Sequence, residues 1–187
     1  MADTGVKYCQ TGASVSSAPY DDQAWTNPGN IVADDTNYAQ ITNPNFDVGT
    51  YSYLLRGTNF DFSVIPDGST IDGIYVTTAA AYVNGAGSYT LVQLVNASSA
   101  LIGDNKAATP VALTTPTIAA NNWGGAADTW GASPTAAMVK SANFGVALGF
   151  EPTAADCDIY ADYVRMTVYY TAPASGFSND VCVVFES

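Results

Sequence analysis

The sequence predicts an all-β fold, an antiparallel β-sandwich of jelly-roll type with extended N- and C-terminal arms. Short apolar runs with a two-residue period recur along the chain, and turn-forming Gly, Pro and Asn separate them. Helical periodicity is nearly absent, and the long connections favour a sandwich over a closed barrel. We expect an N-terminal arm over residues 1–24, the sandwich over 25–171, and a C-terminal linker with an apolar tail over 172–187.

Composition narrows the class of protein. The 187 residues suffice for one domain with a core that needs no disulfides or metals. Hydrophobic residues make up 48% of the chain and charged residues 12%, which excludes a disordered chain. No apolar run approaches the roughly 18 residues of a membrane helix, and the N-terminal segment lacks the features of a secretory signal. We therefore expect a soluble globular protein with no membrane partner.

The charge pattern argues against nucleic-acid binding. The net charge is −12, from 15 Asp and 2 Glu against 5 Lys plus Arg. The basic residues are scattered, so they form no cationic cluster for phosphates. The excess of Asp over Glu is typical of a loop-rich chain, because Asp favours turns. The basic residues are Lys7, Arg56, Lys106, Lys140 and Arg165.

The first half of the chain predicts an arm followed by short strands. Residues 1–24 contain Gly5, Gly12 and Pro19 and show neither a helical nor a strand period, which predicts an arm. Turn formers at 84–87 separate two strand-like runs and predict a hairpin. The predicted strands cover residues 38–41, 51–56, 60–65, 71–83 and 89–95.

Long loops are expected in the second half, before two strong strands. Residues 97–135 are rich in Ala, Thr, Asn, Gly and Pro, which predicts short strands near 111–114 and irregular structure around Trp123 and Trp130. Residues 135–140 predict a single helical turn. The clearest alternation covers residues 144–150 and 159–170; in the second of these runs, Val164, Met166 and Val168 share the core face.

Two segments are predicted to contact other chains. Within residues 144–150, large apolar residues alternate with Gly145, Ala147 and Gly149, so one strand face is nearly bare. A bare face lets another chain or sheet approach closely. The apolar tail could add a strand or a plug to a neighbouring subunit. The residues of the tail that we expect at this interface are Val181, Val183 and Phe185.

Several segments follow the order seen in a known family. Residues 25–30 read Trp-Thr-Asn-Pro-Gly-Asn, residues 35–39 give D-x-x-x-A, and residues 60–76 run from Phe-Asp-Phe through Ile-Pro-Asp-Gly to Gly-Ile-Tyr-Val. Together with residues 130–131, 141–146 and 162–170, they resemble a β-sandwich module of proteins encoded by tailed bacteriophages and their prophages. The resemblance covers residues 25–171. It implies a structural role in the virion and points to no chemistry.

Catalytic chemistry has little support. The chain has no histidine, which excludes imidazole acid/base catalysis, Ser-His and Cys-His pairs and His-ligated metals. A carboxylate pair for glycoside hydrolysis would need two acids with separated pKa values in one cleft, whereas loop Asp residues ordinarily form turns. No phosphate loop or dinucleotide fingerprint occurs. We expect no enzymatic activity and no cofactor.

Calcium is the one metal that residue chemistry allows. Asp156, Asp158 and Asp162, with Glu151 nearby, could supply oxygen ligands, as could the 34–37 segment with two Asp and one Asn. Neither set has the spacing of a known calcium loop, and turn capping explains both. Asp162 has the same parity as the core-facing Val164, so it could instead accept hydrogen bonds at the buried start of its strand.

The cysteines and aromatic residues leave alternatives open. Cys9, Cys157 and Cys182 have no CxxC spacing, which favours buried free thiols over one disulfide between an arm and the body. Three Trp and 12 Tyr could stack on sugars if exposed, but core packing and subunit contacts explain them equally.

These observations lead to two functional hypotheses. The first is a non-enzymatic virion structural protein on the outside of a phage particle, as a capsid decoration or cement protein, a head fibre or a tail-associated appendage. Its partners would be other virion proteins and copies of itself. The second is a carbohydrate-binding adhesion module, with a host-surface glycan as its ligand.

Overall fold

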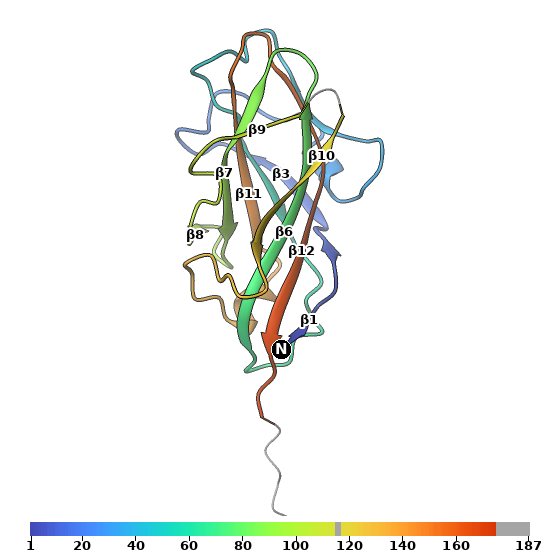
Figure 1. The fold of residues 1–187 in the computed structure, drawn as a ribbon. Helices are drawn as coiled ribbons and strands as arrows, with labels where there is room; N and C mark the ends of the chain where they lie inside the picture. The colour runs from blue at the N-terminus through green and yellow to red at the C-terminus, as the bar shows by residue number, and fades with distance from the viewer. Residues whose placement is uncertain (115–116, 175–187) are drawn as a thin grey trace, which may run out of the picture.

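Two antiparallel β-sheets pack face to face in an elongated sandwich (Figure 1). This computed structural model describes residues 1–114 and 117–174. The predicted all-β sandwich is confirmed, while its jelly-roll connectivity stays a prediction. No helix in the described ranges is long and apolar enough to cross a membrane.

Sheet A is built around one long strand pair. β6 (Thr70–Tyr82) and β12 (Asp158–Thr171) run antiparallel along almost their whole length. β10 (Ala119–Gly125) pairs with the other edge of β6. The far edge of β12 pairs with three short strands in succession: β1 (Ala2–Asp3), β2 (Lys7–Tyr8) and β4 (Ala39–Thr42).

Sheet B lies against sheet A. Its strands follow the order β3 (Thr11–Val15), β5 (Leu54–Thr58), β11 (Gly145–Pro152), β7 (Gly87–Val95) and β8 (Leu101–Ile102), and β9 (Val111–Ala112) also pairs with β7. The one described α-helix, α1 (Ala136–Val139), confirms the predicted helical turn: Met138 N donates to the Thr135 Oγ1 cap at 3.1 Å. A 3-10 turn, η1, covers Pro28–Ile31.

The hairpin predicted across residues 84–87 is wrong. β6 belongs to sheet A and β7 to sheet B, so these residues form a corner between the sheets. Both edges of β6 are already paired, with β12 and β10, which leaves no edge for β7. Turn formers bend the chain in either case, and only the pairing of the flanking strands distinguishes a hairpin from a corner.

Residues 1–24, predicted to be an arm, instead contribute strands to both sheets. β1 and β2 pair with β12, whereas β3 pairs with β5. Thr4 N donates to Val168 O, and Val168 N donates to Thr4 Oγ1, each at 3.0 Å. Strands as short as β1 and β2 are too short to show a two-residue period, so composition alone could not reveal them.

Two further expectations differ from the structure. Residues 60–65 form turns, in which the rings of Phe60 and Phe62 stack 5.5 Å apart. The irregular structure expected around Trp123 is β10, and Trp123 is buried in it. Both segments contribute apolar rings to the core, and apolar content alone does not separate a strand from a buried turn.

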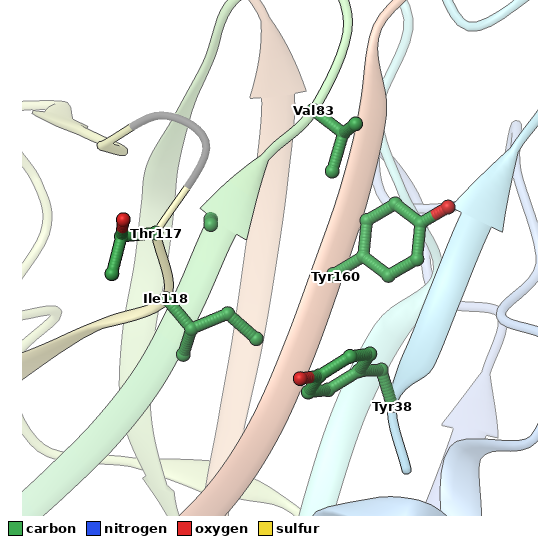
Figure 2. Close-up of a pocket in the computed structure, with 6 residues that line it drawn as sticks. Tyr38, Val83, Thr117, Ile118 and Tyr160 are labelled. Atoms are coloured by element: carbon green, nitrogen blue, oxygen red, sulfur yellow. The ribbon is translucent and has the colours of Figure 1, made fainter. Parts of the chain in front are cut away.

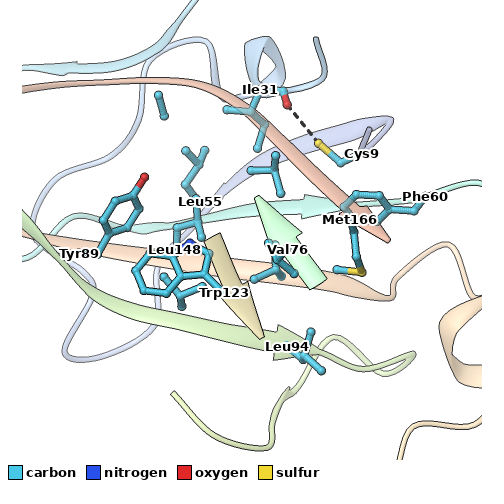
Figure 3. Packing of buried hydrophobic residues seen from close by; sticks show 14 of the residues in the cluster. Cys9, Ile31, Leu55, Phe60, Val76, Tyr89, Leu94, Trp123, Leu148 and Met166 are labelled. Carbon is cyan, nitrogen blue, oxygen red and sulfur yellow. Dashed lines mark hydrogen bonds between the residues drawn. The ribbon is translucent and has the colours of Figure 1, made fainter. Parts of the chain in front are cut away.

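The core lies between the sheets and confirms the predicted faces of the two clearest strands. Phe144, Val146, Leu148 and Phe150 are buried on one side, and Val164, Met166 and Val168 face them from β12. Figure 3 shows Leu148 beside Trp123 and Tyr89, with Val76 and Met166 further along. The alternation therefore gave the correct face for residues 144–150 and for Val164, Met166 and Val168; the bulge between Ala161 and Tyr163 reverses it for residues 159–161.

Truncating a core side chain tests this packing. Leu148 is 1% exposed, so Leu148→Ala should lower the free energy of unfolding by about 2–5 kcal/mol in denaturant melts, through lost burial and a cavity. Val83 is 45% exposed, and Val83→Ala should change it by less than about 0.5 kcal/mol. Equal effects of the two variants would contradict the assigned core.

A glycine in the N-terminal segment tests whether that segment is part of the fold. A Cβ at Gly12 would overlap the Pro28 carbonyl, whereas a Cβ at Gly29 meets nothing within 4 Å. Gly12→Ala should therefore lower the free energy of unfolding by about 1–3 kcal/mol through overpacking. Gly29→Ala, the control, should melt like the parent protein. A silent Gly12→Ala would mean that β3 does not pack on η1 in solution.

Candidate functional site

The bare face of β11 is covered by the chain itself. Gly145, Ala147 and Gly149 are all buried in the single chain. A Cβ at Gly149 would overlap the ring of Tyr20, and a Cβ at Gly145 would overlap the Gly57 carbonyl. The close approach that we expected from another chain or sheet is made at these positions by other parts of the same chain. Ala147 packs in a second apolar cluster with Leu54, Leu91, Val95, Tyr20 and Leu101.

The second predicted interface lies outside the described residues. Val181, Val183 and Phe185 belong to the 175–187 range, and so does Cys182. The tail contact with a neighbouring subunit stays a prediction.

The calcium candidates do not converge. Asp156 lies in a turn with φ 54°, and its backbone N–H donates to Asp47 Oδ1 at 2.9 Å. Asp158 Oδ2 accepts from Asn84 Nδ2 at the start of β12, and Asp162 lies four residues further along the strand. Among the described residues, no group of three or more His, Cys, Asp and Glu side chains could hold a metal ion. Asp156 and Asp158 serve as turn and corner contacts.

Asp162 is a buried carboxylate at a bulge in β12. The register with β6 shifts between Ala161 and Tyr163, and Asp162 is the extra residue. Its side chain is 5% exposed, and Oδ1 accepts from Asp35 N at 3.2 Å, as the sequence suggested for a buried strand start. Burial raises the pKa of this carboxyl; the hydrogen bond from Asp35 opposes the rise, and the charges of Asp34 and Asp35 add to it.

The two described cysteines are buried free thiols. Cys9 Sγ donates to Ile31 O at 3.3 Å, and burial raises its pKa to about 12. The pKa of Cys157 is raised to about 11, first by burial and then by the charge of Asp158. Thiols with raised pKa values are poor nucleophiles, so both are structural.

All three tryptophans are buried, which removes them as sugar-stacking platforms. Trp25, Trp123 and Trp130 are 5%, 7% and 0% exposed. Each indole N–H donates within the protein: to Tyr53 O at 2.9 Å, to Thr78 Oγ1 at 3.0 Å and to Ile74 O at 2.9 Å, respectively. The tryptophans belong to the core, and so do the described phenylalanines, so any aromatic binding surface within residues 1–114 and 117–174 has to be made of tyrosines.

Tyrosines gather on the outer face of sheet A. The bulge at Asp162 places Tyr160 and Tyr163 on the same face although they are three residues apart, because the extra residue resets the alternation. Their partners on β6 are the small residues Ala81 and Ala79. Small residues on the central strand beside large ones on its neighbour leave a trough along the sheet.

The outer trough, as we call this surface, contains two successive hollows. The first has a volume of about 400 Å³ and is lined by Tyr38, Ala81, Val83, Thr117, Ile118 and Tyr160. Figure 2 shows the rings of Tyr38 and Tyr160 on one side and Ile118 on the other; the rings meet edge to face with centroids 5.9 Å apart. The second hollow, of about 350 Å³, is lined by residues that include Tyr75, Thr77, Asn122, Arg165, Thr167 and Tyr169.

Polar groups line the second hollow. Thr77 Oγ1 donates to Asn122 Oδ1 at 3.0 Å, an arrangement that orients the Asn122 amide. The Arg165 guanidinium lies 4.8 Å from the centre of the Tyr163 ring and donates to Tyr8 Oη at 3.5 Å. Sequence reasoning missed this surface. The sequence signal for this surface was the high density of Tyr in residues 160–170. The odd spacing of three residues from Tyr160 to Tyr163 predicted opposite faces for them, so the shared face was not recognised.

Comparison with known proteins gives no relative. No family model matches the chain, and no curated protein or solved structure is significantly similar to it.

The buried carboxyl predicts a pH-dependent effect on stability. Because the pKa of Asp162 is raised in the fold, its ionisation opposes folding as pH rises above the unfolded-state value of about 4. Asp162→Asn keeps the oxygen that accepts from Asp35 and removes the charge. The variant should therefore melt at a higher temperature than the parent at pH 7, and the difference should vanish below about pH 4.

An exposed carboxylate supplies the control of opposite sign. Asp61 Oδ1 accepts from Ser63 Oγ at 2.6 Å and from Ser63 N at 3.2 Å, which lowers the pKa of Asp61. Asp61→Asn should not raise the melting temperature at pH 7. A pH-independent loss of stability in Asp162→Asn would show that hydrogen bonding, and not charge burial, dominates at this bulge.

Proposed function

We propose that this chain is a non-enzymatic structural protein on the exterior of a phage particle, where it acts through contacts with other virion proteins and with copies of itself. The family resemblance of residues 25–171 suggests the setting. Capsid decoration, head fibre and tail appendage are the roles that this proposal covers.

The proposal rests on a difference between the two ends of the elongated sandwich. At one pole, β1 lies beside the end of β12, with Ala2 opposite Tyr170 (Figure 1). At the other pole, three loops meet: Thr153 N donates to Ala86 O at 2.7 Å, and Cys157 N donates to Phe46 O at 3.2 Å. An elongated body with both described ends at one pole suits attachment at that pole and projection of the loops.

The internal construction fits a passive, durable part. Buried polar groups hydrogen-bond to one another inside the core. The Thr78 hydroxyl, for example, donates to Tyr89 Oη and accepts from Trp123 Nε1. The chain also lacks histidine, the commonest acid/base catalyst. Both properties fit a role that is based on surface contacts.

A carbohydrate-binding adhesion module is the second candidate. The sequence argument for this module relied partly on exposed tryptophans, and all three tryptophans are buried. One observation still favours it, the outer trough on sheet A with its paired tyrosine rings.

Copy number in purified particles tests the structural role. Particles produced by the phage or prophage that encodes the chain should contain it at a fixed ratio to the major capsid protein after density-gradient purification. Quantitative mass spectrometry measures this ratio, and a phage-encoded non-structural protein serves as the contamination control. If purification removes the chain from the particles to the same extent as it removes the non-structural control protein, the proposal is contradicted.

A further inference from the structure

The outer trough has a floor and walls that the fold itself does not require. β6 lies in the middle of sheet A and carries Thr77, Ala79 and Ala81 on its outer face. In register beside them, β12 carries Arg165, Tyr163 and Tyr160. A charged, solvated outer face of sheet A would be compatible with the same folding stability. The observed pattern instead places small residues between large aromatic ones; Ala79 and Ala81 are buried at 2% and 0% exposure, so the larger side chains around them form the accessible surface of the groove.

The two hollows follow the same strands and offer different contacts. Ala81 in the first hollow and Thr77 in the second are four residues apart on β6, about 13 Å at the rise of a β-strand. The first hollow presents the edge-to-face rings of Tyr38 and Tyr160. The second presents the Asn122 amide and the Arg165 guanidinium. The groove is therefore apolar at one end and rich in hydrogen-bonding groups at the other.

Sheet pairing limits what could occupy the groove. A peptide strand usually binds by adding to a free sheet edge, through its backbone. Both edges of β6 are paired along the groove, with β10 and β12, so the floor offers side chains only. A ligand has to be recognised by ring faces, one amide, one guanidinium and hydroxyl groups. Sugar rings match this set, because they have apolar C–H faces and hydroxyls at their rims.

Charge favours a neutral ligand. The chain has a net charge of −12, which repels anionic polymers. Among the described residues that line the two hollows, Arg165 is the one cation; its guanidinium lies against the Tyr163 ring and donates one hydrogen bond to Tyr8, which leaves further N–H groups for hydroxyls. We propose that the outer trough of sheet A binds a neutral oligosaccharide, with a sugar ring stacked at Tyr38 and Tyr160 and hydroxyls hydrogen-bonded to Asn122 and Arg165. This binding does not depend on attachment to a virion.

Screening of the purified chain against immobilised glycans tests the proposal. The probe is an array of neutral hexose and N-acetylhexosamine oligosaccharides together with sialylated and sulfated ones, followed by titration of the strongest neutral hit. We expect binding to neutral members, and at least a tenfold loss of affinity in Tyr160→Ala and in Asn122→Ala. Asn122 is exposed, so its variant remains informative if Tyr160→Ala does not fold.

A second tyrosine pair provides the matched control. Tyr51 meets Tyr20 edge to face with centroids 5.4 Å apart, far from the trough on sheet B's side of the molecule. Tyr51→Ala should bind the neutral glycan like the parent. The proposal is overturned if no neutral glycan binds, if only anionic glycans bind, or if Tyr51→Ala loses as much affinity as the trough variants. Unchanged affinity in a folded Tyr160→Ala would also overturn it.

Discussion

The pairing of β6 with β12 is the interaction on which the rest of this structure depends. Their ladder runs from Ile159 opposite Tyr82 to Thr171 opposite Thr70. It presents Ile74, Val76, Val164 and Met166 inward as one wall of the core. It also leaves the far edge of β12 free for β1, β2 and β4, so segments distant in sequence complete the sheet there. Because β12 pairs along both of its edges, its geometry fixes that of its neighbours.

The outer faces of the two sheets differ in how the rest of the chain covers them. In sheet B, the chain covers its own outer face, with the Tyr20 ring over Gly149 and the Leu54 cluster around Ala147. In sheet A, the corresponding face keeps two hollows lined by tyrosines and other side chains, above small residues of β6 that are themselves buried. The same alternation of small and large residues therefore has two outcomes. A small residue permits close approach, and the rest of the fold decides whether the chain itself makes that approach.

The bulge at Asp162 connects stability with the surface. It places a carboxyl group where burial raises the pKa, so ionisation opposes folding there. The same extra residue brings Tyr160 and Tyr163 onto one face and thereby shapes the trough. Bulges commonly redirect side chains at functional positions, at some local expense in regular pairing.

By itself, the sequence determined the all-β class, the helical turn at 135–140, the inward face of residues 144–150 and the inward face of Val164, Met166 and Val168, because these follow from local periodicity and capping. Only the tertiary structure decided the rest. Strands as short as β1 and β2 are specified by the edge of β12 that they pair with, and the 84–87 corner is specified by the filled edges of β6. The tyrosine face needed the bulge, which no periodic pattern reveals, since one extra residue reverses the alternation. Partners far apart in sequence set these features, and local residue preferences do not encode them.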